Sequence, residues 1–497
     1  MTLLFLLLLG LITYFIVQRG VASSTTTPVW VLWLVMMTPA FVWTVWIETA
    51  PEDQPPPLAL TIGLFVICSL LYLYLIQLGR IRSPEESPSA SPPSEEPAAT
   101  PTLPPAQLNP DEEKQLQQCF PWSDYALHQT EYRGQVIVCR GQLRTESAKA
   151  YQTVQAKIKA VFGDRFLIVF QEGFEGKPFF ALIPNSEWNA TPSEDAKKRQ
   201  QMQPLIAFGL LLFTLLTATV VGAVGFNELP PELADNSSQL WQNLHLLASG
   251  LPYAIALVTI LGTHELGHYL MARRYKIKVA LPCFIPIPFF VGTLGAFTQI
   301  RSPIPHRRAL FDVQISGPLA GLAVTLPVLC WGLSHSEVIS WSEETSLFNI
   351  NSLNPTATFL LAILSKLALG DRLILDRALD LHPVAIAGFL GLAITAVSLI
   401  PVGQLDGGRV VHAMFGQRTA MVIAQITRLL ILVLAFVRQE FLWWAIFLLL
   451  MPVGDEPALN DVTELDNARD MLGLITLAIL VMIIVPAPVT LIQWLYG

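Results

Sequence analysis

The residues best suited to chemistry lie in the stretch ILGTHELGHYLMARR, Ile260 to Arg274. His264 and His268 are four residues apart there, and Glu265 follows the first of them. On a helix, residues four apart lie one turn from each other on the same face, so both imidazoles can bind one Zn²⁺ ion. Glu265 would lie beside the metal, where it can take a proton from metal-bound water. The alternative is a pair of buried structural histidines bonded to helix carbonyls. The spacing favours a hydrolytic zinc site.

A zinc site of this kind needs a third protein ligand and one position left open for water. The best candidate is Asp406 in SLIPVGQLDGGRVVHAMFG, because it follows an apolar span at the same predicted membrane depth as the two histidines. Gly407 and Gly408 would permit a break in the helix around it, as membrane proteins tolerate beside a protein-lined or wet cavity. The alternative for Asp406 is an ordinary helix-end residue. The competing ligands are His306, His382 and His412.

The elements that position these residues are predicted to cross a membrane. The chain of 497 residues is 53% hydrophobic and 14% charged, whereas soluble domains are about 45–50% apolar and 25% charged. Its net charge of -8 and the absence of a basic stripe argue against nucleic acid as a partner. Apolar runs long enough to cross a bilayer, or nearly so, are expected at residues 3–17, 29–47, 58–78, 204–226, 251–272, 311–333, 383–405, 419–437, 441–453 and 471–495.

A soluble module interrupts these spans. The stretch SPEESPSASPPSEEPAATPTLPPAQLNP, residues 83–110, is rich in Pro, Ser and Glu and has few large apolar residues, which is typical of a flexible linker. After it, GQVIVCRGQLR, RFLIVFQ and PFFALIP indicate strands, and SAKAYQTVQAKIKAVF carries apolar residues at helical spacing. The predicted fold is therefore an α-helical polytopic membrane protein with a small soluble α/β domain inserted between transmembrane helices.

Six segments follow from this pattern. We expect N-terminal transmembrane helices, a disordered linker, the α/β domain, a transmembrane helix with an extracytoplasmic loop, a catalytic membrane core and C-terminal transmembrane helices. In the same order, their bounds are 1–80, 81–110, 111–200, 201–247, 248–418 and 419–497.

Lysine and arginine near the span ends predict the orientation. Arg19, Arg80 and Arg82, and the runs at 197–199, 273–278 and 306–308 fall on one side if the spans alternate, and the opposite loops carry neither residue. By the positive-inside rule that side is cytoplasmic. The α/β domain and the candidate metal site are both expected towards it.

The stretch PCFIPIPFFVGTLGAF follows the histidine helix. Its prolines forbid a regular helix, and Gly292 and Gly295 suit a re-entrant or strand-like loop. Such a loop could pair with an extended substrate. A packed connector between two spans is the alternative.

The H-E-x-x-H helix, the SGPLAG that follows it and the later L-D-G together resemble the site-2 proteases, peptidase family M50. Longer stretches from about Gly134 onward are similar to the EGY-type branch of plastids and cyanobacteria. The resemblance implies that His264, His268 and Asp406 bind Zn²⁺ and that Glu265 is the catalytic base and acid.

Two positions depart from the family pattern. Ser398 and Gly321 stand where asparagine is frequent in the family. Those asparagines are thought to help hold the substrate backbone, so the departures bear on substrate clamping and leave the metal ligands intact.

The resemblance implies an intramembrane zinc metalloprotease that hydrolyses peptide bonds within or near transmembrane segments of membrane proteins. The expected partners are these substrates and the lipid bilayer, and a homo-oligomer is compatible with the sequence. The expected location is a cyanobacterial plasma or thylakoid membrane. The alternatives are a membrane metal transporter, which would want ionisable groups along several spans, and a catalytically silent scaffold, which would have no use for Glu265.

Overall fold

The structure is a computed structural model. It describes residues 10, 13–14, 28–49, 64, 68, 71, 75, 108–173, 176–185, 194–226, 247–287, 291–340, 352–354, 357–374, 377–437, 442–452 and 454–496. The spans predicted at 3–17 and 58–78 and most of the predicted linker lie outside the described residues, apart from a few isolated positions.

The chain divides into two units, residues 1–101 and 102–497. In the first unit, helix α2 (Val29–Thr49) coincides with a predicted span. The Trp33 indole N–H in this helix donates a hydrogen bond of 2.7 Å to the Gly10 carbonyl.

The second unit begins with the small α/β domain. Its elements are α4 (Pro110–Gln118), β1 (Tyr125–Arg133), β2 (Val136–Leu143), α5 (Ser147–Phe162), β3 (Phe166–Glu172) and β4 (Pro178–Pro184). The strands form an antiparallel sheet in the order β1-β2-β4-β3. Tyr151 of α5 stacks on Phe170 and Phe180 of the sheet. The three predicted strands and the predicted helix are present. Helix α4 and strand β1 are additional, because both are largely polar and carry no clear apolar period.

The membrane part contains long apolar helices joined by short elements. Its helices are α6 (Glu194–Phe226), η1 (Ala248–Gly250), α10 (Leu251–Arg274), α11 (Arg307–Ser334), α12 (Phe359–Leu369), η2 (Gly370–Arg372), α13 (Pro383–Leu399), α14 (Asp406–Phe415), α15 (Gln417–Val437), α16 (Leu442–Leu450), α17 (Asn467–Ile484) and α18 (Val489–Tyr496). Its strands are β5 (Cys283–Pro286), β6 (Thr293–Phe297), β7 (Glu337–Ser340), β8 (Ser352–Leu353) and β9 (Arg377–Asp380).

Four helices in the described part of the chain contain a window long and apolar enough to cross a membrane. The windows are Met202–Gly225, Arg307–Ser334, Gln417–Ala435 and Asn467–Ile484. Helix α10 is as long, but its C-terminal half carries histidine, glutamate and arginine. The protein is therefore an integral membrane protein that carries a small soluble α/β domain, as predicted.

Two predicted spans are interrupted. The span expected at 383–405 ends as a helix at Leu399, and α14 begins only at Asp406. Pro401 and Gly403, whose φ is 53°, occupy the interruption. The span expected at 471–495 is split between α17 and α18 around Pro486 and Pro488. In each case proline removes a backbone N–H and obstructs the continuing helix.

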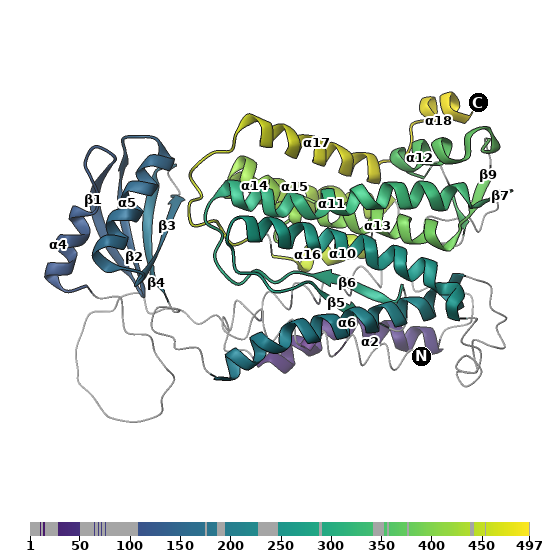
Figure 1. The fold of residues 1–497 in the computed structure, drawn as a ribbon, viewed down its shortest axis with the longest axis horizontal. Coiled ribbons are helices and arrows are strands. Elements are labelled where there is room, and N and C mark those ends of the chain that lie inside the picture. The colour runs from purple at the N-terminus through teal and green to yellow at the C-terminus, as the bar shows by residue number, and fades with distance from the viewer. Residues whose placement is uncertain are drawn as a thin grey trace. The chain divides into compact units, whose positions relative to one another are not determined.

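Helix α11 lies at the centre of the helix packing. It runs beside α10 and α13 and contacts α14, and the antiparallel hairpin β5-β6 lies between α10 and α6 (Figure 1). The Thr217 hydroxyl of α6 donates to the Gly292 carbonyl at 2.7 Å, and the Tyr253 hydroxyl of α10 donates to the Val291 carbonyl at 2.9 Å. The strand-like conformation expected for this loop is present, and the hairpin is fixed to both helices.

Candidate metal centre

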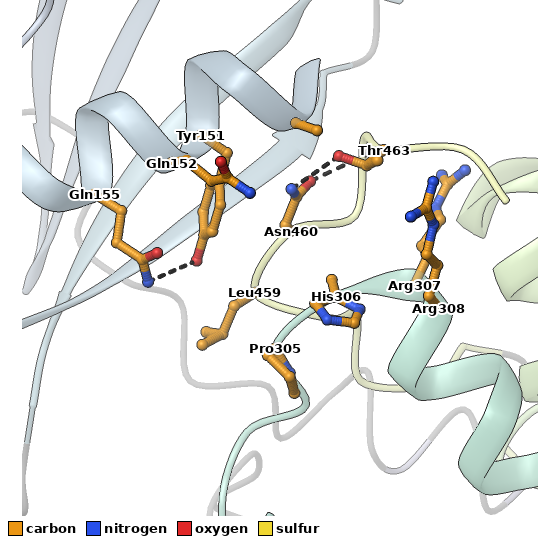
Figure 2. A pocket seen from close by; sticks show the side chains of 11 residues that line it. Tyr151, Gln152, Gln155, Pro305, His306, Arg307, Arg308, Leu459, Asn460 and Thr463 are labelled. Carbon is orange, nitrogen blue, oxygen red and sulfur yellow. Dashed lines mark hydrogen bonds between the residues drawn. The ribbon is translucent and has the colours of Figure 1, made fainter. Parts of the chain in front are cut away.

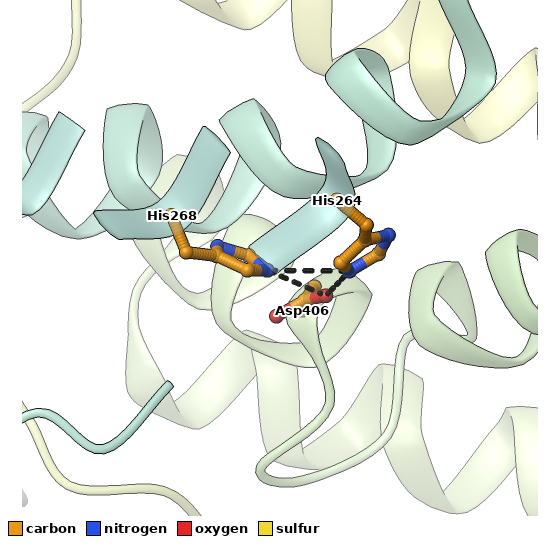
Figure 3. A group of neighbouring side chains, drawn as sticks. All are labelled: His264, His268 and Asp406. Carbon is orange, nitrogen blue, oxygen red and sulfur yellow. Dashed lines mark hydrogen bonds and ion pairs between the residues drawn. The ribbon is translucent and has the colours of Figure 1, made fainter. Parts of the chain in front are cut away.

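The two histidines of α10 and the aspartate at the start of α14 face one another. His264 Nε2 and His268 Nε2 are 3.3 Å apart, and they lie 3.5 and 3.4 Å from Asp406 Oδ2 (Figure 3). All three ligand atoms fall within 4.8 Å of one another. If the three atoms bound one zinc ion with zinc–ligand bonds of about 2.0–2.1 Å at tetrahedral angles, they would lie about 3.3–3.4 Å from one another. Two imidazole nitrogens and a carboxylate at this spacing match the size and chemistry of a zinc site.

A hydrogen bond from α11 orients His268. Its Nδ1 lies 2.8 Å from the Val313 carbonyl. Since a carbonyl only accepts, Nδ1 carries the proton, and the Nε2 lone pair is directed at the cluster. Metal-ligating histidines commonly donate their other ring N–H to such a group. The contact therefore sets the tautomer that a metal ligand needs.

Two glycines of α11 provide the space that the imidazoles occupy. A Cβ on Gly317 would lie 2.1 Å from His268 Nε2, and one on Gly321 would lie 3.1 Å from His264 Nδ1. The glycines are four residues apart, as the histidines are, so one turn of α11 matches one turn of α10. Gly267 of α10 in turn leaves room for the backbone of α11, because a Cβ there would lie 2.5 Å from the Ser316 carbonyl oxygen. SGPLAG, which the family resemblance singled out, thus lies against both imidazoles, and its glycines provide the space for them.

Asp406 owes its position to the turn that precedes α14. The helix break expected around Asp406 lies directly before it, and α14 runs through Gly407 and Gly408. Their role is close packing: a Cβ on Gly407 would lie 1.8 Å from the Leu399 carbonyl oxygen, and one on Gly408 would lie 2.5 Å from the Gly403 carbonyl oxygen. The glycines let α14 fold back against the end of α13, which brings its first residue to the histidines.

A cavity of about 180 Å³ opens beside the cluster. It is lined by Glu265, His268, Val279, Phe297, Thr298, Ile300, Val313, Gln314, Asp406 and Arg409. Glu265 is buried and lines this cavity, and it is not one of the three residues of the cluster. The end of β6 and the residues after it form the opposite wall. The cavity is large enough to hold a water molecule beside Glu265, His268 and Asp406.

Comparison with known proteins agrees with this geometry. The family model described as "Peptidase family M50" matches residues 252–437, a span that contains both histidines, Glu265 and Asp406. Over these residues the chain is similar to that family. It is 29% identical over 373 residues to the "Probable zinc metalloprotease EGY2, chloroplastic" of Arabidopsis thaliana, covering 73% of this chain and 62% of the relative.

Two further relatives extend the comparison. The chain is 28% identical over 408 residues to the "Probable zinc metalloprotease EGY1, chloroplastic" of Arabidopsis thaliana, which covers 77% of this chain and 73% of the relative. It is 28% identical over 252 residues to the "Probable zinc metalloprotease EGY3, chloroplastic" of Oryza sativa subsp. japonica, covering 48% of this chain and 42% of the relative. The match to the EGY2 relatives spans less than two thirds of their length.

The three competing histidines have other partners. His306 caps α11, its Nδ1 accepting from the Ala309 N–H at 3.1 Å. His382 caps α13 in the same way, accepting from the Val384 N–H at 3.2 Å. His412 is fully buried between two carboxylates. None of the three belongs to the cluster of His264, His268 and Asp406.

The carboxylates beside His412 are Asp455, 2.7 Å from Nδ1, and Asp461, 3.0 Å from Nε2. Asp461 also pairs with the buried Arg307 at 3.1 Å. Because both ring nitrogens face carboxylates, both donate, and the imidazolium is held with a pKa raised to about 9 by these contacts, which outweigh burial. The cluster connects α14, the start of α11 and the loop after α16.

The same loop contacts the α/β domain. The Phe170 N–H of β3 donates to the Leu459 carbonyl at 2.6 Å, and the Asp461 N–H donates to the Phe170 carbonyl at 2.9 Å. A second cavity of about 290 Å³ lies beside this contact, between Gln152 and Gln155 of α5 on one side and His306 and Arg308 on the other (Figure 2). No sequence pattern indicated this connection.

Proposed function

We propose that this protein is an intramembrane zinc metalloprotease that hydrolyses peptide bonds within or near transmembrane segments of membrane proteins. His264, His268 and Asp406 are the proposed Zn²⁺ ligands, and Glu265 is the proposed catalytic base and acid. The observation that carries the proposal is the convergence of three ligand atoms at tetrahedral spacing beside a buried glutamate. The relatives named as probable zinc metalloproteases support it.

A bound zinc ion would act as a Lewis acid that activates water and polarises the scissile carbonyl. Glu265 would accept the proton of the attacking water and pass it to the leaving amine nitrogen. Its position at the cavity wall suits both transfers, because the cavity also contains the ligands His268 and Asp406. The low polarity around a buried site strengthens the electrostatic interactions within it.

The hairpin β5-β6 is the proposed binding surface for the substrate backbone. Among the strands that the structure describes, β6 pairs only with β5, and its side chains Leu294 and Phe297 are exposed by 61% and 49%. Phe297 and the adjacent Thr298 reach the cavity of the metal centre. An extended peptide paired with β6 would run past Glu265. A helical substrate must unwind before it can bind so, and helix-destabilising residues near the cut should help.

The proposal also includes the side of the membrane that the metal centre faces and the membrane in which the protein lies. Basic residues at the end of α10 and at the start of α11 support a metal centre towards the cytoplasmic side, by the positive-inside rule. The relatives are named chloroplastic. A cyanobacterial plasma or thylakoid membrane remains the proposed location of this chain.

The test uses purified full-length protein in detergent, incubated with single-pass membrane segments that contain glycine or proline near the expected cut. Wild type is expected to cleave these segments. Glu265→Gln and His264→Ala should each lower the cleavage rate at least about 100-fold, which for Glu265 is the size of effect that loss of a general base produces. Thr263→Ala is the matched control, since its hydroxyl bonds only the Thr259 carbonyl of its own helix. Cleavage that survives Glu265→Gln would contradict the assigned base. Metal transport in vesicles without cleavage would favour a transporter, and binding of substrate without either would favour a scaffold.

A further inference from the structure

Gln314 of α11 is a buried polar residue that touches the proposed ligand Asp406. It is 3% exposed. With its amide oriented to suit its neighbours, the nitrogen donates to Asp406 Oδ1 at 2.8 Å and the oxygen accepts from Arg409 Nη1 at 3.1 Å. These contacts form a chain from the arginine through the amide to the carboxylate.

These contacts give the two carboxylate oxygens of Asp406 different partners. Oδ2 faces both histidines at 3.5 and 3.4 Å, whereas Oδ1 faces the Gln314 amide. A carboxylate held in this way offers one oxygen to a metal and cannot rotate without breaking a buried hydrogen bond. Leaving a buried polar group without its partner is unfavourable. Gln314 therefore favours the monodentate orientation.

Arg409 determines which way the amide points. A guanidinium has only donors, so the Gln314 atom next to it has to be the oxygen. The NH₂ group is then directed at Asp406. Arg409 lies three residues after Asp406 on α14, while Gln314 comes from α11. The chain thus connects the ligand to its own helix through a side chain of the neighbouring helix, and all three residues line the same cavity.

We propose that Gln314 and Arg409 are positioning residues for the metal, Gln314 by holding Oδ1 of Asp406 and Arg409 by fixing the Gln314 amide. This rests on the proposed function only in taking Asp406 as a ligand. Partners of metal ligands typically contribute 10- to 100-fold to metal affinity or activity. Gln314 should contribute within this range, and Arg409 less, because it acts through Gln314.

The experiment measures the zinc affinity of the purified full-length protein by competition with a chelator of known affinity, together with the visible spectrum of the Co²⁺ form. Gln314→Leu is expected to weaken zinc binding by about 10- to 100-fold. Gln314→Glu should weaken it further, since a carboxylate would replace the donor next to Asp406. Both should alter the Co²⁺ spectrum, which a purely structural role would leave unchanged.

Arg409 provides the second arm. Arg409→Met is expected to weaken zinc binding, whereas Arg409→Lys, which keeps a donor for the Gln314 oxygen, should recover most of the affinity. The double variant Gln314→Leu with Arg409→Met should bind zinc no more weakly than Gln314→Leu alone. A double variant with fully additive losses would overturn the role given to Arg409.

The matched control is Thr325→Val on the same helix, where the buried hydroxyl bonds only the Gly321 carbonyl. It should bind zinc like wild type. The thermal midpoint of each metal-free variant separates lost folding from lost affinity. Zinc affinity of Gln314→Leu and Gln314→Glu within threefold of wild type would overturn the proposal.

The proposed function and the positioning role of Gln314 and Arg409 can fail independently of each other. If wild type binds zinc, the variants weaken it and no substrate is cut, the positioning role stands and the protease assignment fails. If the protein cuts substrate and the variants bind zinc like wild type, only the positioning role fails. A wild-type protein that binds neither Zn²⁺ nor Co²⁺ would overturn both.

Discussion

At the scale of single residues, the candidate metal centre depends on two glycines, which lack side chains, as much as on the proposed ligands. Gly317 and Gly321 leave room for His268 and His264, and the approach is tighter at Gly317. Close packing allows little adjustment between two long helices. The His268 ring cannot keep its place if a methyl group occupies that volume.

Alanine at these glycines should therefore act as a graded test of the site. Gly317→Ala should lower proteolysis by at least about 100-fold, because it displaces His268 by the order of an ångström. Gly321→Ala should cost less, since the nearest atoms need to shift by only a few tenths of an ångström. Gly209→Ala on α6, where a Cβ meets nothing within 4 Å, is the control. Equal activity of Gly317→Ala and wild type would show that His268 is not confined as described.

Some of these residues could be predicted from sequence and others could not. His264, Glu265 and His268 form a local pattern whose helical geometry is known in advance, and Asp406 could be inferred from membrane depth. Gly317 and Gly321 lie in SGPLAG, which the family resemblance singled out, but the motif alone did not show that they face the histidines. Gln314 carries no signal in the sequence, because its role exists only once α11 lies against α14.

At the scale of elements, the buried ionic cluster around His412 holds α14 against the loop after α16 and the start of α11. The charged groups that face His412 are Asp455 and Asp461, and Arg307 faces Asp461. Removing one member of a buried charged set typically costs about 3–5 kcal/mol, since the remaining charges lose their compensation. Asp461→Asn should therefore lower the thermal midpoint markedly. The same change at the exposed Asp164 should leave it nearly unchanged.

The cluster also predicts a pH dependence of stability. The pKa of His412 is raised from 6.5 to about 9 in the folded protein. A raised pKa means that the stabilisation is fully present below about pH 6.5 and is lost as pH rises through about 9. Its upper limit is on the order of 3 kcal/mol. The thermal midpoint of wild type should fall between pH 6.5 and 9.5 by more than that of His412→Gln. His128→Gln, at an exposed position of the α/β domain, should follow wild type.

Element boundaries were the part of the membrane fold least accessible to sequence. The apolar runs ending at 405 and 495 look continuous by composition, yet the helices stop at Leu399 and Ile484. Prolines within those runs explain both interruptions. The first interruption is the functional one, because it allows α14 to begin with Asp406.

At the scale of the whole molecule, the loop after α16 connects the α/β domain to the metal centre. Residues 459–461 pair with Phe170 of β3 and with His306 at the start of α11. The same loop provides Asp455 and Asp461 to the His412 cluster. A displacement of the α/β domain would therefore reach the helix that begins with Asp406.

Hydrogen exchange can test this connection. The Phe170 and Asp461 amides are hydrogen-bonded across it and should exchange slowly. Asn460→Pro removes the N–H that donates to the Pro305 carbonyl at 3.0 Å, and it should speed exchange at both amides and at Arg307. Glu456→Ala, at an exposed position of the same loop, should leave exchange unchanged. Slow exchange in both variants would mean that the two parts are held together by other contacts.

The α/β domain itself was foreseeable, because its helix and three of its strands have regular apolar spacing. Its attachment was not. Phe170 pairs through its backbone with residues almost 300 positions later, and this pairing needs the edge of a folded sheet. No local pattern in LNDVTE, residues 459–464, indicates it.

The central claim is that one divalent ion binds between His264, His268 and Asp406. Its most direct test is the zinc content of the purified protein combined with X-ray absorption at the zinc edge, for wild type and Asp406→Ala. We expect one zinc per wild-type chain with nitrogen and oxygen ligands at about 2.0–2.1 Å, and loss of that zinc in Asp406→Ala. Zinc bound by Asp406→Ala with the stoichiometry, affinity and ligand distances of wild type would contradict the account.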